Sequence, residues 1–119
     1  MSSLEIFLTE DKREFKPGEN ITGKTSWSFT EDPEELHIRL FWYTEGKGSQ
    51  DVCIVSDETF TKPGQSGERP FSIQTPIGPY SFSGKLISLI WAIEVIAEPD
   101  LGTERLEISI SPNGKEIAL

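Results

Sequence analysis

The sequence predicts an all-β fold, an antiparallel sandwich or barrel of about seven or eight short strands. Three observations support this prediction. Apolar and polar residues alternate in one run after another, which is the period of strands that bury a single face. Turn-forming residues such as Pro17-Gly18 separate the runs. No segment keeps a helical period beyond one or two turns.

The first half of the chain contains three alternating runs and one apolar run. Residues 4–9 (LEIFLT), 21–29 (ITGKTSWSF) and 36–43 (LHIRLFWY) place their larger apolar side chains at alternate positions. Residues 52–55 (VCIV) are apolar throughout. Between the first two runs, Lys16-Pro17-Gly18-Glu19 predicts a type II turn, because Pro fixes φ and Gly accepts a positive φ.

The second half repeats the pattern. Residues 71–74 (FSIQ), 86–97 (LISLIWAIEVIA) and 105–110 (RLEISI) alternate again, and each is expected to form a strand. Pro112-Asn113-Gly114 predicts a tight hairpin between Ile110 and Ile117, since Asn-Gly tolerates the positive φ that such turns need.

Composition excludes several classes of protein. The chain has 119 residues, 20 acidic against 11 basic, and a formal net charge of −9. Such an acidic chain is not expected to bind nucleic acid, which needs Lys and Arg facing phosphates. A single cysteine excludes an internal disulfide and a cysteine-based zinc site.

No targeting signal or membrane span is expected. Residues 1–10 have neither a basic start nor an apolar run of signal length. The longest apolar-rich stretch, 86–97, is interrupted by Ser88 and Glu94 and is shorter than the roughly 20 apolar residues that cross a bilayer. We therefore expect a soluble, cytoplasmic protein.

Trp27, Trp42 and Trp91 lie on the apolar phase of three different predicted strands. A Trp side chain buries roughly 150–250 Å². All three are therefore expected in the core. Gly23, inside a strand, predicts either a bulge or the close approach of a neighbour.

Two stretches resemble the arrestin family. Residues 15–24 (FKPGENITGK) are similar to the pattern at the start of the second arrestin strand. Residues 70–76 (PFSIQTP), followed by 78–85 (GPYSFSGK) and a long strand that includes Trp91, are similar to the second arrestin signature. The resemblance covers roughly residues 4–110, and the order and spacing of its motifs agree with the family.

The resemblance implies an immunoglobulin-like β-sandwich with a scaffold or adaptor role, because relatives bind other proteins rather than catalyse reactions. Arrestins have two such sandwiches, whereas this chain is long enough for one, so residues 1–119 are expected to be a single arrestin-like domain. The basic phosphate-sensing residues of receptor-binding arrestins have no counterpart here, and neither receptor binding nor phosphate recognition is carried over.

Nothing in the sequence predicts catalysis, a cofactor or a metal. His37 is the only histidine and lies on the polar phase of its strand, so it is interpreted as a surface residue. Cys53 has apolar neighbours and is interpreted as a buried small hydrophobe. The acidic clusters at 10–14 and 31–35 lack the ligand spacing of a calcium loop and are interpreted as solvated charge.

One candidate partner surface emerges from the alternation. If Trp42 and Trp91 face the core, the opposite phase of the third and sixth strands faces outward in one sheet. Such an apolar patch indicates a surface for a partner or for self-association. An inverted face, or a covering tail at 115–119, is the alternative. The candidate residues are Phe41, Tyr43, Leu86, Ile90 and Ile96.

The favoured function is a non-enzymatic interaction or scaffold module that binds a protein partner, or a second copy, through a sheet face or an edge strand. The terminal strand 4–9 is the candidate edge. A carbohydrate-binding or small hydrolytic sandwich domain is the alternative, and a permanent subunit of a larger assembly is a third reading. Tryptophans on the polar phase would favour sugar binding, and all three lie on the apolar phase.

Overall fold

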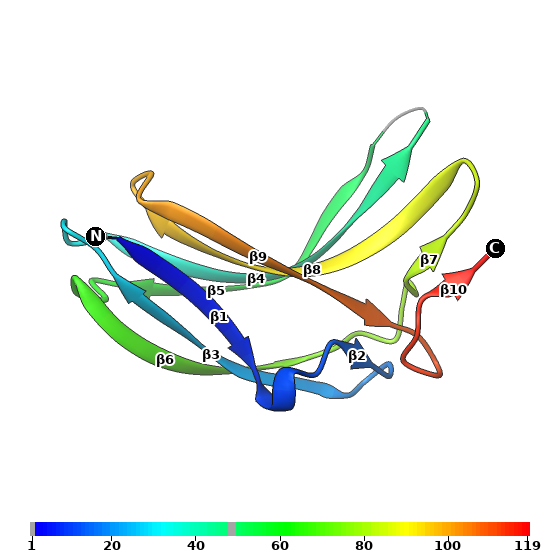
Figure 1. Cartoon of the computed structure of the whole chain (residues 1–119), viewed down its shortest axis with the longest axis horizontal. Helices are drawn as coiled ribbons and strands as arrows, with labels where there is room; N and C mark the ends of the chain where they lie inside the picture. Colours follow the sequence, from blue (N-terminus) through cyan, green and yellow to red (C-terminus); the bar gives the residue numbers. More distant parts are fainter. Residues whose placement is uncertain (1, 48–49) are drawn as a thin grey trace.

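The computed structural model describes residues 2–47 and 50–119 and shows two packed β-sheets (Figure 1). The small sheet has the strand order β1-β3-β6, formed by Ser3–Leu8, Asn20–Ser28 and Ser66–Gln74. The large sheet is built around two 12-residue strands, β4 (Glu35–Gly46) and β8 (Ile87–Glu98). β5 (Val52–Thr61) flanks β4, and β9 (Gly102–Ile110) flanks β8. Within the described residues this gives seven strands of six residues or more, as predicted.

Short elements close one end of the sandwich. A 3₁₀ turn, η1 (Thr9–Asp11), leads from β1 to β2 (Glu14–Phe15), which pairs in parallel with β9. β7 (Phe82–Ser83) pairs with β8, and β10 (Ile117–Ala118) pairs in parallel with β7. The hairpin predicted at Asn113-Gly114 is therefore wrong. The turn forms, but β10 joins β7 instead of returning along β9.

The core lies between the facing surfaces of the two sheets. β4 and β8 run antiparallel with Leu40 opposite Ile93 and Trp42 opposite Trp91, so every second residue of both strands enters the core. Trp91 is fully buried, Trp27 is 6% exposed, and Trp42 is half-buried against the core cluster. The prediction for the three tryptophans is confirmed for two of them, and Trp42 lies at the core's edge.

Buried indole groups have polar partners. The Trp91 Nε1–H donates to the Pro79 carbonyl oxygen at 2.8 Å, and the Trp27 Nε1–H donates to the Gly64 carbonyl oxygen at 3.0 Å. Both bonds attach a loop to the core, since a buried N–H without a partner is costly. Trp91 thereby holds the loop that leads into β7 against the core-facing side of the large sheet.

Two glycine predictions are confirmed. Gly18 has a φ of +84°, and the Glu19 N–H donates to the Lys16 carbonyl oxygen at 3.0 Å, as in a type II turn. A hydrogen bond from Lys12 and one from the Lys16 N–H lower the pKa of the Glu19 carboxyl. A Cβ on Gly23 would collide with the Phe7 carbonyl oxygen of β1. Gly23 is therefore the site of close approach between β1 and β3.

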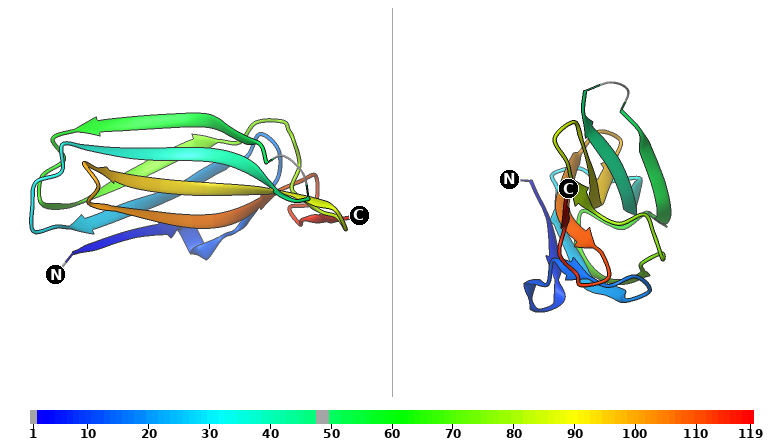
Figure 2. Two further views of the ribbon diagram at one scale, coloured as in Figure 1. Left: turned by 90° about the horizontal axis from the view of Figure 1, so that it is seen from above. Right: turned by 90° about the vertical axis from the view of Figure 1, so that its right-hand side faces the viewer.

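Both β5 and β6 are longer than the predicted runs 52–55 and 71–74. β5 lies at one edge of the large sheet (Figure 2, left), and β6 lies at an edge of the small sheet. The register between β4 and β5 shifts between Leu40 and Phe41, so that Val55 is an extra residue in β5. Such a bulge bends and twists the strand that contains it.

Candidate functional site

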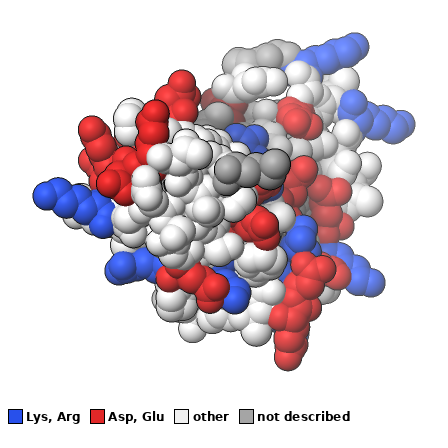
Figure 3. Space-filling view, turned by 60° about the vertical axis from the view of Figure 1, so that its left-hand side comes forward, with Lys and Arg blue, Asp and Glu red and all other residues white. Residues whose placement is uncertain are grey.

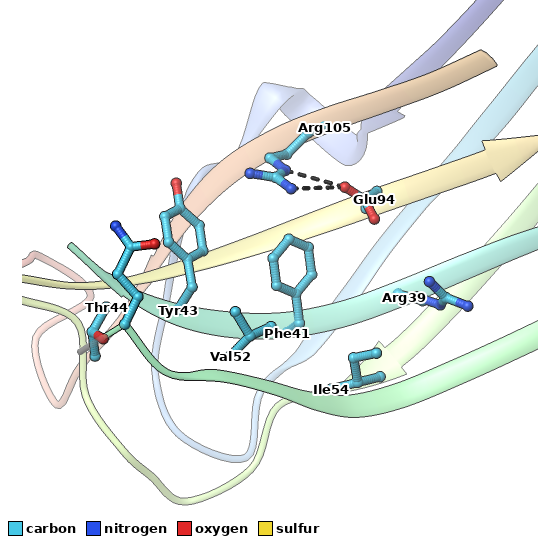
Figure 4. Close-up of a pocket in the computed structure, with 9 residues that line it drawn as sticks. Arg39, Phe41, Tyr43, Thr44, Val52, Ile54, Glu94 and Arg105 are labelled. Atoms are coloured by element: carbon cyan, nitrogen blue, oxygen red, sulfur yellow. Dashed lines mark hydrogen bonds and ion pairs between the residues drawn. The ribbon is translucent and has the colours of Figure 1, made fainter.

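A hollow of roughly 280 Å³ lies on the outer face of the large sheet, away from the core (Figure 4). β4 supplies Phe41 and Tyr43, and β5 supplies Val52 and Ile54. These residues lie opposite each other in the register of the two strands, Phe41 with Ile54 and Tyr43 with Val52. The ribbons of the large sheet rise at both ends from its middle, so this outer face is concave (Figure 1).

An aromatic pair and one arginine form a wall of the hollow. The Phe41 and Tyr43 rings stack with centroids 5.9 Å apart. The Arg105 guanidinium carbon lies 4.9 Å from the Phe41 centroid and 5.4 Å from that of Tyr43. These distances fit cation–π contacts. Because of this cover, Phe41 is only 5% exposed although it points away from the core.

Glu94 holds the arginine in place. The Arg105 Nη2 and Nε atoms donate to Glu94 Oε2 at 2.9 and 3.2 Å. Arg105 and Glu94 are opposite each other in the register of β9 and β8, so the sheet itself brings them together. The hydrogen bonds that Arg105 donates to Glu94 raise the pKa of Arg105. The guanidinium therefore stays charged and oriented.

The pKa of the Tyr43 hydroxyl lies above its ordinary value. Burial raises the pKa of Tyr43 above its ordinary value, and the carboxylates of Glu107 and Glu45 raise it further. The phenol is thus neutral at physiological pH. Beside Arg105, it adds a second hydrogen-bonding group to this wall.

A second group of charges begins at Arg39, which also lines the hollow, and occupies the other half of this outer face. The Arg39 Nε donates to Asp57 Oδ2 at 3.0 Å. His37 lies beside Asp57, with Glu35 and Glu98 at 3.3 and 3.8 Å from its Nε2 atom. The His37 side chain is 12% exposed, so it is more covered than its interpretation as a surface residue implies. The face therefore divides into a mainly apolar half, which contains the Arg105–Glu94 pair, and a charged half.

The structure brings together part of the predicted partner surface. The third and sixth predicted strands do share one sheet, and Tyr43 is opposite Ile90, next to Phe41. Ile96 lies in the charged half, opposite His37 and beyond Glu94. Leu86 precedes β8, is 66% exposed and lines a separate depression with Leu119. Residues 115–119 do not cover the hollow, because β10 pairs with β7.

Sequence reasoning missed Val52, Ile54 and Arg105 as part of this face. Val52 and Ile54 belong to the apolar run 52–55, which was expected to form a strand but not to line this surface. In the structure they are 67% and 51% exposed. Arg105 lies on the polar phase of its strand. Only the register of β8 with β9 shows that it reaches Phe41.

Cys53 is exposed, so its interpretation as a buried residue is wrong. The reason is its place on the edge strand β5, opposite the half-buried Trp42. Among the described residues, no group of three or more His, Cys, Asp and Glu side chains could hold a metal ion. Within the same residues, no helix has the length and apolar character needed to cross a membrane.

The comparisons with known proteins concern the fold. No protein-family model matches the chain, and no curated protein matches it. Among solved structures, it is similar to the sporulation control protein Spo0M from Bacillus subtilis, with a TM-score of 0.67 and 16% sequence identity. The match covers 92% of this chain and 49% of Spo0M, so the chain spans about half the length of that protein.

A weaker likeness is to a β-glucosidase from Listeria innocua, with a TM-score of 0.50 and 11% identity. It covers 98% of this chain but 16% of the glucosidase. At these identities both likenesses concern the fold and not the chemistry. Together with the two-sheet architecture, the Spo0M likeness shows that the fold is an arrestin-like β-sandwich.

Proposed function

We propose that the chain is a non-enzymatic interaction domain that binds a protein partner through the outer face of its large sheet. The observation that carries the proposal is the hollow formed by Phe41, Tyr43, Val52 and Ile54. Aromatic and apolar side chains with one oriented arginine are typical of the centre of protein interfaces. Ile90 extends this surface on β8.

We regard residues 1–119 as one arrestin-like domain that acts in the cytoplasm. Spo0M is described as a sporulation control protein. A regulatory domain with the same fold is the class of protein that we propose here.

The test compares proteins that co-purify with tagged chains expressed in the native cells. Tyr43→Ser combined with Ile90→Ser changes two half-buried side chains of the proposed face. Ile77→Ser is the matched control, because Ile77 is 84% exposed in a loop outside the face. Circular dichroism checks that all chains are folded.

We expect a stoichiometric protein with the unchanged chain and with Ile77→Ser, and its loss with the double variant. A solution mass that falls from dimer to monomer in the double variant would identify the partner as a second copy. Equal recovery by all three chains would contradict the proposal. So would a co-purified small molecule in the absence of any stoichiometric protein.

A further inference from the structure

The outer side of β5 has no neighbouring strand among the residues that the structure describes. β5 pairs with β4 on one side and forms the end of the strand order β10-β7-β8-β4-β5. Figure 2 (left) shows the strand at this edge. In an antiparallel pair, the N–H and C=O groups of every second residue point away from the partner. The edge of β5 is therefore a row of backbone groups available for pairing.

The register identifies which residues point outward. The Thr44 N–H donates to the Asp51 carbonyl oxygen at 3.0 Å, and the Asp51 N–H donates to Thr44 Oγ1 at 2.9 Å. The backbone of Asp51 thus faces β4. Pairing stays regular up to Ile54, so the backbone groups of Val52 and Ile54 face the open side.

The side chains at this edge are apolar and exposed. Val52, Ile54 and Val55 are 67%, 51% and 42% exposed. Proteins usually protect an open edge with lysine, proline or a bulge. β6, an edge of the small sheet, contains Arg69 and Pro70, whereas β5 has neither a basic residue nor a proline. Its bulge comes at Val55, after the regular stretch at 52–54.

The charges around the edge indicate the chemistry of what binds there. Asp51, Asp57 and Glu58 are acidic, and residues 50–61 contain no Lys or Arg. Arg39 of β4 pairs with Asp57, so Asp51 and Glu58 provide the remaining negative charge. A second copy is disfavoured here. Antiparallel pairing of two 52–55 segments, with Val52 opposite Val55, would place Asp51 of each opposite Ser56 of the other and diagonal to Asp57, on chains of net charge −9.

We propose that the free edge of β5 binds an extended, basic and apolar segment of the partner protein as an additional strand. Its backbone pairs with Val52 and Ile54. Its apolar side chains lie beside these two residues at the margin of the hollow, and its Lys or Arg side chains lie near Asp51 and Glu58. The inference rests on the proposed function as a protein-binding domain and specifies the chemistry of the partner.

The test uses synthetic peptides of alternating valine and lysine, about eight residues long with blocked ends, which is enough to span the length of a typical strand. One comparison peptide has glutamate in place of lysine. Another has the valine–lysine sequence with alternate backbone nitrogens methylated. Titration calorimetry gives the affinities, and amide chemical shifts in NMR spectra locate the site.

We expect the valine–lysine peptide to bind and to shift the amide signals of residues 52–58. The glutamate peptide and the methylated peptide should each bind at least about tenfold more weakly, the factor that corresponds to about 1.4 kcal/mol. No binding by the valine–lysine peptide, or equal binding by the methylated one, would overturn the proposal. So would shifts confined to β1 or to the middle of the outer face.

Substitutions in the protein, in place of changes in the peptide, test the same pairing. Ile54→Pro removes an outward-facing N–H at a position where an edge strand tolerates proline. It should weaken binding of the valine–lysine peptide at least about tenfold, while Ile54→Val should change it less than about threefold. If circular dichroism shows that Ile54→Pro does not fold, the methylated peptide decides the question.

The Tyr43→Ser, Ile90→Ser double variant separates this proposal from the preceding one. It leaves the backbone of β5 intact and should bind the valine–lysine peptide within about threefold of the unchanged chain. A protein partner that is lost with the double variant while the peptide fails to bind would support the face and refute the edge. Peptide binding in the absence of any such partner would support the edge and refute the face.

Discussion

At the residue scale, Gly23 sets the spacing within the small sheet. It is opposite Leu8 in β1 and Phe71 in β6, and its missing side chain allows the backbone of β1 to approach. The added methyl group of Gly23→Ala would collide with the Phe7 carbonyl oxygen, which belongs to the backbone and cannot move aside alone.

Gly23→Ala is therefore expected to lower the free energy of unfolding by about 1–3 kcal/mol, the usual cost of overpacking. Urea unfolding followed by tryptophan fluorescence measures this change. Thr22→Ala is the matched control, because Thr22 is adjacent and exposed. A loss no larger than that of the control would contradict the role assigned to Gly23.

Tyr43 gives a second prediction at this scale, concerning pH. Burial and the nearby Glu107 raise its pKa in the folded state. A raised folded pKa means that the contribution to stability is complete below the unfolded pKa of about 10 and is lost as the pH rises through the folded pKa. Between pH 9 and 11, the unchanged chain should therefore lose more stability than Tyr43→Phe. Parallel losses in urea unfolding would refute the shift.

At the scale of elements, alternation predicted the strands that bury one face. β1, β3, β4 and β8 begin and end within three residues of the runs read from the sequence. β5 and β6 were underestimated because edge strands bury little of either face. The parts of β5 and β6 outside the predicted runs, such as residues 56–61 (SDETFT) of β5, show no apolar alternation. The two-residue strands β7 and β10 give no periodic signal at all.

The candidate site was predictable only in part, for a related reason. Phe41, Tyr43 and Ile90 share a face because alternation within two strands places them there. Val52, Ile54 and Arg105 join them through the register between neighbouring strands, which a single sequence does not specify. The cover of Arg105 over Phe41 depends on this register. Alternation alone therefore predicts Phe41 to be exposed.

The C-terminal strand β10 gives the prediction at this scale. The Ile117 N–H donates to the Ser81 carbonyl oxygen at 3.0 Å, and the Leu119 N–H donates to that of Ser83 at 2.9 Å. Deleting residues 117–119 removes both bonds but leaves β8 and β9 paired. We expect the free energy of unfolding to fall by about 1–3 kcal/mol with the fold retained.

Urea unfolding measures this loss, and circular dichroism checks the strand content. Leu119→Ser is the control, since it keeps the backbone bond and changes a side chain that is 75% exposed. An unfolded truncated chain would show that β10 contributes more than these two bonds. An equal loss in the control would assign the effect to the side chain.

At the scale of the whole molecule, the net charge and the hollow have opposite effects on association with a partner. The chain extends over 45 × 31 × 21 Å, and acidic side chains are spread over the face that Figure 3 shows. Within the outer face, the carboxylates of Glu35, Asp57 and Glu98 lie around His37, and Glu94 at the hollow is paired with Arg105. The net charge of −9 repels other copies at long range, while the charges that line the hollow are paired, Arg105 with Glu94 and Arg39 with Asp57.

The large sheet also extends beyond the small one. The end of β4, the start of β5 and the start of β8 rise away from the small sheet (Figures 1 and 2). Gly46 of β4, Val52 of β5 and Ile87 of β8 at this end are exposed, whereas Ile38 and Val95, farther along β4 and β8, are fully buried. This end is one layer thick and the middle is packed on the small sheet.

Such a single layer opens more easily than the rest, because local opening costs little where few apolar contacts are buried. In hydrogen–deuterium exchange, we expect the amides of residues 44–46 and 87–88 to exchange at least about tenfold faster than those of Ile38 and Val95. Uniform protection along β4 and β8 would show that the strands open as one unit. If protection instead falls from the middle of these strands toward this end, the wall of the hollow that contains Tyr43 and Val52 can open locally. It then adjusts to a ligand while the packed part of the sandwich remains closed.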